Sequence, residues 1–81
     1  MNERHRQILE RLSKDKPEPV DLETLRQGYD WGIDQLIADL TELGRGQLID
    51  VVGLKREHIG GNDKLIGEVE ITSLGEGTLG E

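Results

Sequence analysis

The sequence predicts a small α+β domain in which three helices precede a two-stranded antiparallel ribbon. Between residues 31 and 44 apolar residues recur every three or four positions, which is the period of an amphipathic helix. From residue 48 to residue 72 the dominant period is two, which is typical of strands with one buried and one exposed face. Glycine and proline residues separate these segments. The chain therefore places its helices first and its strands last.

The composition limits the architecture to a single domain. With 81 residues the chain has room for one hydrophobic core, which at this size buries only about 60 to 65 % of the unfolded surface. The absence of cysteine excludes disulfides and thiolate metal sites. No apolar run approaches the roughly 20 residues of a membrane span, and the N-terminal segment lacks an apolar centre. We expect a cytoplasmic protein that makes no membrane contact and whose thin core is supplemented by homodimerisation.

Charge is distributed unevenly along this acidic chain. The formal net charge is -7, yet of the ten lysine and arginine residues only Arg26 lies between residues 17 and 43. The other basic residues lie in the first helical segment and in the ribbon. The acidic total opposes long-range attraction to polyanions, but a local basic patch can still bind a phosphate backbone.

The first helix is predicted at about residues 3–14. Pro17 and Pro19 end it, because proline cannot donate a backbone hydrogen bond and biases the preceding residue toward extended conformations. Its buried edge is predicted to contain Ile8, Leu9 and Leu12.

A second, shorter helix is predicted at about residues 21–27. Val20 before it is a candidate for a short strand, and the Asp21 carboxylate is placed to cap the helix. Leu22 and Leu25 point inward. Gly28 follows where a helix often ends in a left-handed residue, and Asp30 is the expected cap of the next helix.

The third helix is predicted at about residues 31–44 and ends at Gly44 or Gly46. One stripe of this helix is apolar and consists of Ile33, Leu36, Ile37, Leu40 and Leu43. The remaining surface is predicted to be a polar outer face that carries Asp34, Gln35, Asp39 and Glu42.

The ribbon is predicted at about residues 48–72, with a reversal at Gly60-Gly61-Asn62-Asp63, because these residues tolerate positive φ. Its buried face is predicted to contain Ile49, Val51, Val69 and Ile71, which complete the core together with Ile8, Leu9, Leu12, Leu25, Ile33, Leu36, Ile37 and Leu40. Residues 73–81 are expected to form a weak tail, in which Ser73 caps a short helix with Glu76.

The order and spacing of these segments resemble the winged helix-turn-helix superfamily of DNA-binding domains, and small transcriptional regulators within it. The matching segments are Ile8-Leu9-Glu10-Arg11-Leu12, Val20-Asp21-Leu22-Glu23-Thr24-Leu25, Leu36-Ile37-Ala38-Asp39-Leu40, Leu48-Ile49 and Ile71-Thr72-Ser73-Leu74-Gly75. The resemblance implies a three-helix winged helix-turn-helix with a C-terminal β-ribbon wing. It also implies that the third helix and the wing bind duplex DNA, often as a dimer.

The candidate DNA-binding residues lie on the third helix and the wing. Lysine, arginine and histidine side chains of the wing contact phosphates, and glutamine can pair with adenine while an indole can stack on a base. The candidates are Trp31, Gln35, Arg45, Lys55, Arg56, His58 and Lys64. Two alternatives involve no DNA binding. The hairpin can be solvated, with Glu57 and Asp63 neutralising its basic residues, and Trp31 can be a partly buried residue that anchors the turn.

The acidic side chains of the third helix support an alternative function. Asp34, Asp39 and Glu42 would face phosphates at close range, but would attract a basic protein partner to a winged-helix interaction or assembly module. No pattern indicates an enzyme, a cofactor or a metal site, since His5 and His58 lie in separate segments without closely spaced carboxylate and histidine ligands.

Overall fold

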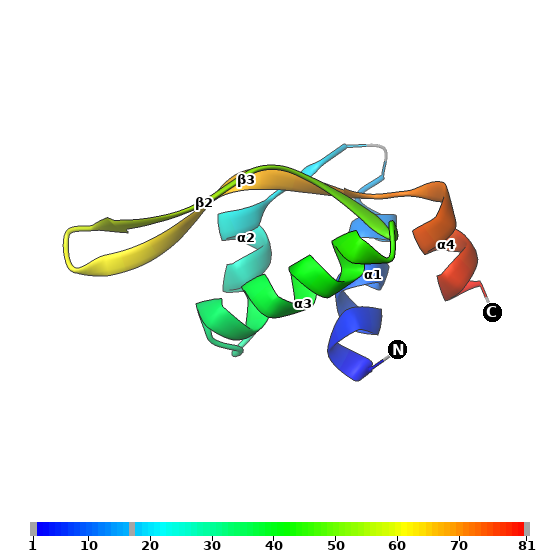
Figure 1. Cartoon of the computed structure of the whole chain (residues 1–81), viewed down its shortest axis with the longest axis horizontal. Coiled ribbons are helices and arrows are strands. Elements are labelled where there is room, and N and C mark those ends of the chain that lie inside the picture. Colours follow the sequence, from blue (N-terminus) through cyan, green and yellow to red (C-terminus); the bar gives the residue numbers. More distant parts are fainter. Residues whose placement is uncertain (1, 17, 81) are drawn as a thin grey trace.

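The computed structural model describes residues 2–16 and 18–80, and over those ranges it is an α+β domain with four helices and a three-stranded antiparallel sheet (Figure 1). The sheet order is β1-β3-β2. The elements follow in the order α1 (Glu3–Lys14), β1 (Val20–Asp21), α2 (Leu22–Gln27), α3 (Ile33–Arg45), β2 (Ile49–Ile59), β3 (Asn62–Ile71) and α4 (Ser73–Leu79). The α+β class, the three leading helical segments and the hairpin are therefore as predicted.

Local capping fixes the starts of the first two helices. The Asn2 side chain accepts a 2.8 Å hydrogen bond from the His5 amide, and α1 ends at Lys14, while Pro17 lies outside the described residues. The Asp21 carboxylate accepts from the amides of Glu23 and Thr24 at 3.1 and 3.2 Å, which confirms its predicted role as the cap of α2.

The turn between α2 and α3 differs from its prediction. Gly28 was expected in the left-handed region, but its φ is -80°. The turn closes by hydrogen bonds from Gly28 N to Leu25 O and from Tyr29 N to Arg26 O, which need no left-handed residue. The assignment of Asp30 as the cap of α3 is also wrong, because α3 begins at Ile33 and its cap is Gly32, which offers no side chain.

One hydrophobic core joins the first three helices to one face of the sheet. Ile33, Ile37 and Val51 were predicted in the core but are only partly buried and pack against it. Val20 and Leu65 are buried although neither was expected there. The buried apolar residues are Ile8, Leu9, Leu12, Val20, Leu22, Leu25, Leu36, Leu40, Leu43, Ile49, Leu65, Val69 and Ile71.

The β2–β3 hairpin is the longest feature of the fold and extends past the helices at its closed end (Figure 1). Its two strands pair from Ile49 opposite Ile71 to Ile59 opposite Asn62. Gly60 and Gly61 form the turn with φ values of 61° and 83°, which confirms the predicted reversal. The projecting hairpin gives the molecule a length of 42 Å along one axis against 23 and 21 Å along the others.

The C-terminal segment forms a regular helix, α4, although its two glycines, Gly75 and Gly77, disfavour helix on propensity alone. Thr72, and not Ser73 as predicted, caps it by accepting a 3.1 Å hydrogen bond from the Gly75 amide. Gly75 packs so closely on the loop before β2 that a Cβ atom there would lie 2.2 Å from the Leu48 carbonyl oxygen. Tertiary packing therefore outweighs the weak intrinsic propensity of this segment.

Candidate nucleic-acid interface

The exposed surface of α3 includes a stripe that runs along the helix, beside which Gln35 and Glu42 are also exposed. Asp34, Ala38, Thr41 and Arg45 follow one another at spacings of four, three and four, and all four are exposed. The helix extends one residue beyond its predicted end, so Arg45 belongs to its last turn. Because Ala38 and Thr41 are small, another molecule can approach the backbone of the helix closely at the middle of the stripe.

Asp39 does not belong to that outer surface, and the prediction that it does is wrong. It follows Leu36 by three positions and precedes Leu43 by four, which places it on the buried face, where only 2 % of its surface is exposed. Arg4 Nε donates to its Oδ2 at 2.9 Å, and His5 Nε2 lies 3.1 Å from its Oδ1. Burial acts to raise the pKa of Asp39, but the hydrogen bonds from Arg4 and His5 outweigh it and hold that pKa below its ordinary value.

Two candidate DNA-binding residues at the start of α3 interact within the chain. The Gln35 side-chain amide donates to Asp39 Oδ1 at 3.1 Å. The Trp31 ring stacks on Tyr29 with a centroid separation of 4.2 Å and an interplanar angle of 1°, and both rings are partly buried. Tyr29 in turn donates from its hydroxyl to the Gln7 carbonyl at 3.1 Å. These contacts match the alternative role for Trp31, in which a partly buried ring anchors the turn.

The distal hairpin, defined as residues 55–66, has two different faces. Successive side chains of a strand alternate between faces, and buried Leu65 identifies the face that turns toward the helices. Arg56, paired with Leu65, and His58, paired with Asp63, share that inner face. The outer face carries the remaining residues of both strands, namely Lys55, Glu57, Ile59, Asn62, Lys64 and Ile66.

Arg56 joins the distal hairpin to the first turn of α3. Its guanidinium forms ion pairs with Asp34 on α3 and with Asp63 on β3, the latter at 2.7 Å. His58 Nδ1 lies 2.8 Å from the other Asp63 oxygen. The hydrogen bonds from Arg56 and then His58 lower the pKa of Asp63 below its ordinary value. Asp34, Arg56, His58 and Asp63 therefore form one polar cluster, here called the hairpin latch.

The remaining basic candidates are more accessible. Lys55 pairs with Glu57 on its own strand at 3.1 Å, and both side chains lie on the outer face of the hairpin. Arg45 and Lys64 are exposed, and the described part of the chain offers neither of them an ion-pair partner. The fold brings Arg56, His58 and the start of α3 together, but Arg45 lies at the other end of that helix, roughly 16 Å away at 1.5 Å per residue.

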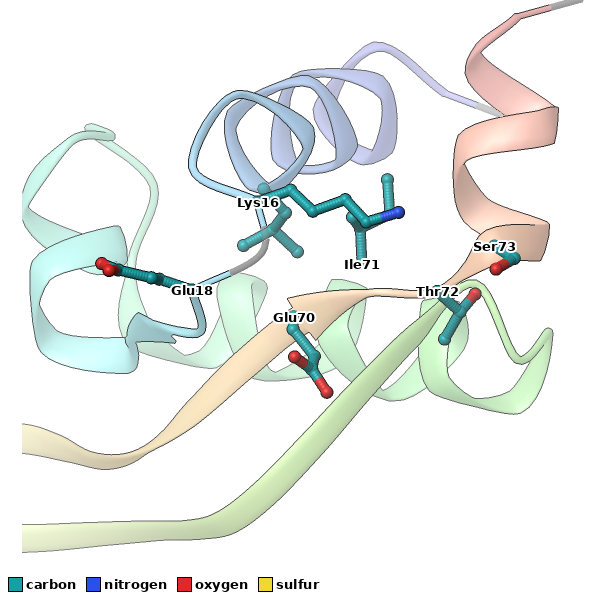
Figure 2. Close-up of a pocket in the computed structure, with 7 residues that line it drawn as sticks. Lys16, Glu18, Glu70, Ile71, Thr72 and Ser73 are labelled. Atoms are coloured by element: carbon teal, nitrogen blue, oxygen red, sulfur yellow. The ribbon is translucent and has the colours of Figure 1, made fainter.

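The opposite face of the sheet is acidic. At the base of the hairpin Asp50 pairs with Glu70 and Val52 pairs with Glu68, and these side chains are exposed on the face away from the core. A shallow pocket next to Glu70 lies where the end of α1 meets the end of β3 (Figure 2). Lys16 crosses this pocket and pairs with Glu76 at 2.6 Å, and Glu18 also lines it. Because its walls carry carboxylates, this pocket is not suited to a phosphate.

Sequence reasoning missed two polar contacts that hold the site in place. Arg4 neutralises buried Asp39, and Glu23 links α2 to β3 by accepting from the Leu65 amide at 3.0 Å while it pairs with Arg26. The hydrogen bonds from Arg26 and then from the Leu65 amide lower the pKa of Glu23 to about 2. The position of Asp39 on the leucine stripe was a signal for its burial, but nothing in the sequence indicated the Glu23 contact.

Comparison of the chain with protein-family models, with curated proteins and with solved structures finds no match. Within residues 2–16 and 18–80, no helix combines the length and the apolar character needed to cross a membrane.

Proposed function

We propose that this chain is a DNA-binding transcriptional regulator of the winged helix-turn-helix type, with α3 in the major groove and the distal hairpin as the wing. The observation that carries the proposal is the contact between Arg56 and Asp34. It sets the hairpin beside the exposed stripe of α3, so that the two elements form one continuous surface. The element order, with a short strand before α2 and a hairpin after α3, supports the same assignment.

The charges of α3 are compatible with this use, although the chain as a whole is acidic. Asp34 pairs with Arg56, Asp39 is buried against Arg4 and His5, and Glu42 Oε2 lies 3.3 Å from His5 Nε2. Each acidic side chain of the helix therefore has a basic neighbour. The small side chains of Ala38 and Thr41 suit contact with base edges, including the thymine methyl group. Trp31 and Gln35 at the start of the helix remain proposed contacts that require rearrangement on binding.

The basic residues of the outer hairpin face would contact the phosphate backbone. Fluorescence anisotropy of a labelled random duplex, measured against salt concentration, tests this directly. Lys55→Ala and Lys64→Ala should each weaken binding on all sequences alike and lower the salt slope by about one unit. Lys14→Ala is the matched control, because it removes the same charge from an exposed position on α1, and it should leave the salt slope unchanged.

Asp34→Asn gives a second test with the opposite sign. This change removes a negative charge from the exposed stripe, while the asparagine oxygen can still accept a hydrogen bond from Arg56, so duplex affinity should increase. Asp39→Asn is unsuitable for the same purpose, because Asp39 is buried in an ion-pair network. The proposal would be contradicted if the protein did not bind duplex DNA at low salt, or if Asp34→Asn bound it more weakly than the unaltered chain.

Two half-sites of a DNA operator are bound by the two subunits of a winged-helix dimer, and we therefore expect a homodimer on a palindromic duplex. Light scattering of the protein with and without such a duplex measures the stoichiometry. A single protein chain bound per palindrome at saturation would count against this expectation.

The acidic sheet face supports a second candidate, a protein interaction or assembly module. Val52 is 65 % exposed and is flanked by the carboxylates of Asp50, Glu68 and Glu70, a surface that complements a partner segment with both basic and apolar residues. Glu68→Gln and Glu70→Gln would weaken binding of such a partner. Neither change removes a basic residue, so neither should weaken duplex binding, and the two variants therefore separate the two functions.

A further inference from the structure

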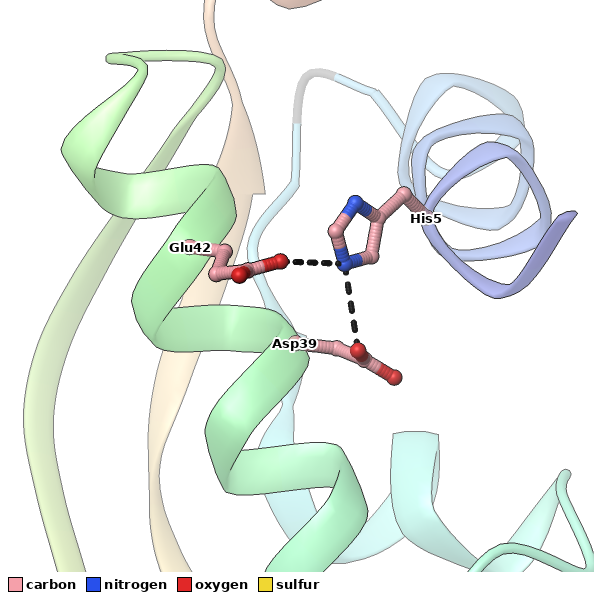
Figure 3. A group of neighbouring side chains, drawn as sticks. All are labelled: His5, Asp39 and Glu42. Atoms are coloured by element: carbon pink, nitrogen blue, oxygen red, sulfur yellow. Dashed lines mark hydrogen bonds and ion pairs between the residues drawn. The ribbon is translucent and has the colours of Figure 1, made fainter. Parts of the chain in front are cut away.

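Three side chains that can serve as metal ligands meet between α1 and α3, next to the exposed stripe of α3. His5 comes from the first turn of α1, and Asp39 and Glu42 come from successive turns of α3 (Figure 3). His5 Nε2 lies 3.1 Å from Asp39 Oδ1 and 3.3 Å from Glu42 Oε2. All three potential ligand atoms lie within 4.8 Å of one another. The cluster could not be recognised from residue spacing in the sequence, because α1 and α3 meet only in the folded protein.

We propose that His5, Asp39 and Glu42 bind a divalent transition-metal ion of the Zn²⁺ class, which fastens α1 to α3. Zinc bonds to imidazole nitrogen and carboxylate oxygen are about 2.0 to 2.2 Å long, so neighbouring ligand atoms of a tetrahedral site lie roughly 3.3 Å apart. The distances of 3.1 and 3.3 Å around His5 Nε2 match that separation. The two carboxylate oxygens lie within 4.8 Å of each other, and the exposed Glu42 side chain can move to complete the site.

The ligand set determines the class of ion. One imidazole nitrogen with two carboxylate oxygens is typical of zinc and of other first-row divalent ions. Calcium and magnesium prefer ligand sets made of oxygen alone, and copper(I) prefers sulfur. Two carboxylates also offset the charge of a dication, and Arg4 is the basic side chain closest to them.

The surroundings of Asp39 orient it as a metal ligand. Arg4 Nε donates to Asp39 Oδ2 at 2.9 Å, and Arg4 Nη2 makes a longer 3.5 Å hydrogen bond to Oδ1, the oxygen that lies nearest His5 Nε2. Ligating carboxylates commonly have such an outer hydrogen-bond partner on the second oxygen. Gln35 also donates to Oδ1 at 3.1 Å, and as an exposed residue it can turn away into solvent when an ion takes that oxygen.

The cluster is accessible from one side only. The side chains of His5 and Asp39 are 10 % and 3 % exposed, whereas that of Glu42 is 66 % exposed. An ion can enter past Glu42, and water can occupy the fourth coordination position. Because the ligands belong to two helices, binding would stabilise the folded chain, since the unfolded chain holds no such preformed set.

The chain supplies a matched control, because its other histidine, His58, also lies beside a carboxylate, Asp63, at 2.8 Å. Isothermal titration of the full chain with Zn²⁺ should give one site per chain, and the melting temperature should rise with Zn²⁺. His5→Gln and Glu42→Gln should each weaken Zn²⁺ binding by at least about tenfold. His58→Gln should bind Zn²⁺ as the unaltered chain does.

Glu42→Gln keeps the test decisive if His5→Gln fails to fold, because Glu42 is exposed. Co²⁺ bound in the site should give the strong visible absorption of a tetrahedral complex, and Glu42→Gln should lose it. Absence of a Zn²⁺ site, or equal losses in His58→Gln and the two ligand variants, would overturn the proposal. Neither measurement uses DNA, so its outcome is independent of the proposed function.

Discussion

The two ends of the β2–β3 hairpin are stabilised by different forces. At the hairpin base, defined as residues 49–52 with residues 68–71, Ile49 pairs with Ile71 and Val51 pairs with Val69, and these side chains face the helices. In the distal hairpin Ile59 and Ile66 are 51 % and 41 % exposed, and polar contacts of the hairpin latch replace most apolar burial. The base is therefore part of the core, whereas the distal part is a projecting arm with few buried contacts.

This difference separates stability from recognition. Burial of apolar surface contributes most of the free energy of folding, while exposed ion pairs contribute little and are easily rearranged. A substitution in the arm can therefore change binding without unfolding the protein, whereas a substitution of a buried residue of the base lowers the stability of the fold.

A break in the strand pairing marks the boundary between the two parts. The register shifts between Val52 and Lys55, where Gly53 has a φ of 71° and Gly67 a φ of 125°. Glycine adopts these values at little cost, and such irregularities bend a hairpin and increase its twist. The ribbon thus changes direction where it leaves the core.

The largest expected effect comes from the core against which the base packs. Leu36 is 1 % exposed, and Leu36→Ala should lower the free energy of unfolding by about 2 to 4 kcal/mol, through lost burial and the cavity left behind. Urea denaturation followed by circular dichroism measures the change. Ile59→Ala in the arm is the control and should cost less than about 1 kcal/mol. Equal losses in the two variants would remove the distinction between base and arm.

Gly67→Ala should have the next largest effect, because it tests the boundary itself. A Cβ atom at this position would lie 2.8 Å from the carbonyl oxygens of both Val52 and Gly53, in addition to the strain of a positive φ. We expect a loss of roughly 1 to 3 kcal/mol. Gly61→Ala is the matched comparison, since its φ of 83° is also positive but no atom lies within 4 Å of a Cβ there. A smaller loss of unfolding free energy for Gly61→Ala in the same urea titration would indicate that the close backbone approach at Gly67 causes the difference.

The smallest of the three effects concerns Glu23, which secures the inner end of the arm through Leu65. Its pKa is lowered from 4.5 to about 2, so its contribution to stability is complete above about pH 4.5 and is lost as the pH falls toward 2. Glu23→Gln should cost roughly 1 to 2 kcal/mol at pH 7. The difference in melting temperature between the variant and the unaltered chain should shrink over that acidic range.

Glu10→Gln provides a comparison for the Glu23 variant at pH 7. It removes an exposed ion pair with Arg6 within α1 and leaves every contact between elements intact, so its cost should be smaller. A difference for Glu23→Gln that stayed constant between pH 7 and pH 2.5 would contradict the assigned role of the carboxylate.

The sequence predicted the elements that depend on local chemistry. Leucine periodicity located α3, the Asp21 carboxylate located the start of α2, and the Gly60-Gly61 pair located the reversal. Each of these signals acts within a few residues.

Contacts between distant segments were not predictable in the same way. Asp39 was assigned to the polar face because its side chain is charged, although its spacing from Leu36 and Leu43 places it on the buried leucine stripe. Its partners Arg4 and His5, and the bond from the Leu65 amide to Glu23, arise only when separate helices and strands pack together. For the candidate site, the individual residues were identifiable, but the pairing of Arg56 with Asp34 was not.

The pairing of Val20 in β1 with Val69 in β3 has a consequence for how the chain is made. Synthesis proceeds from the N-terminus, so α1, α2 and α3 are made before β3, the central strand of the sheet. Until then the leucines that pack against β3, Leu22 and Leu25 among them, lack their partner surface. Pairings between distant residues also slow folding. The core of the nascent chain is therefore incomplete until β3 has been made, and the leucines that stay exposed until then favour aggregation.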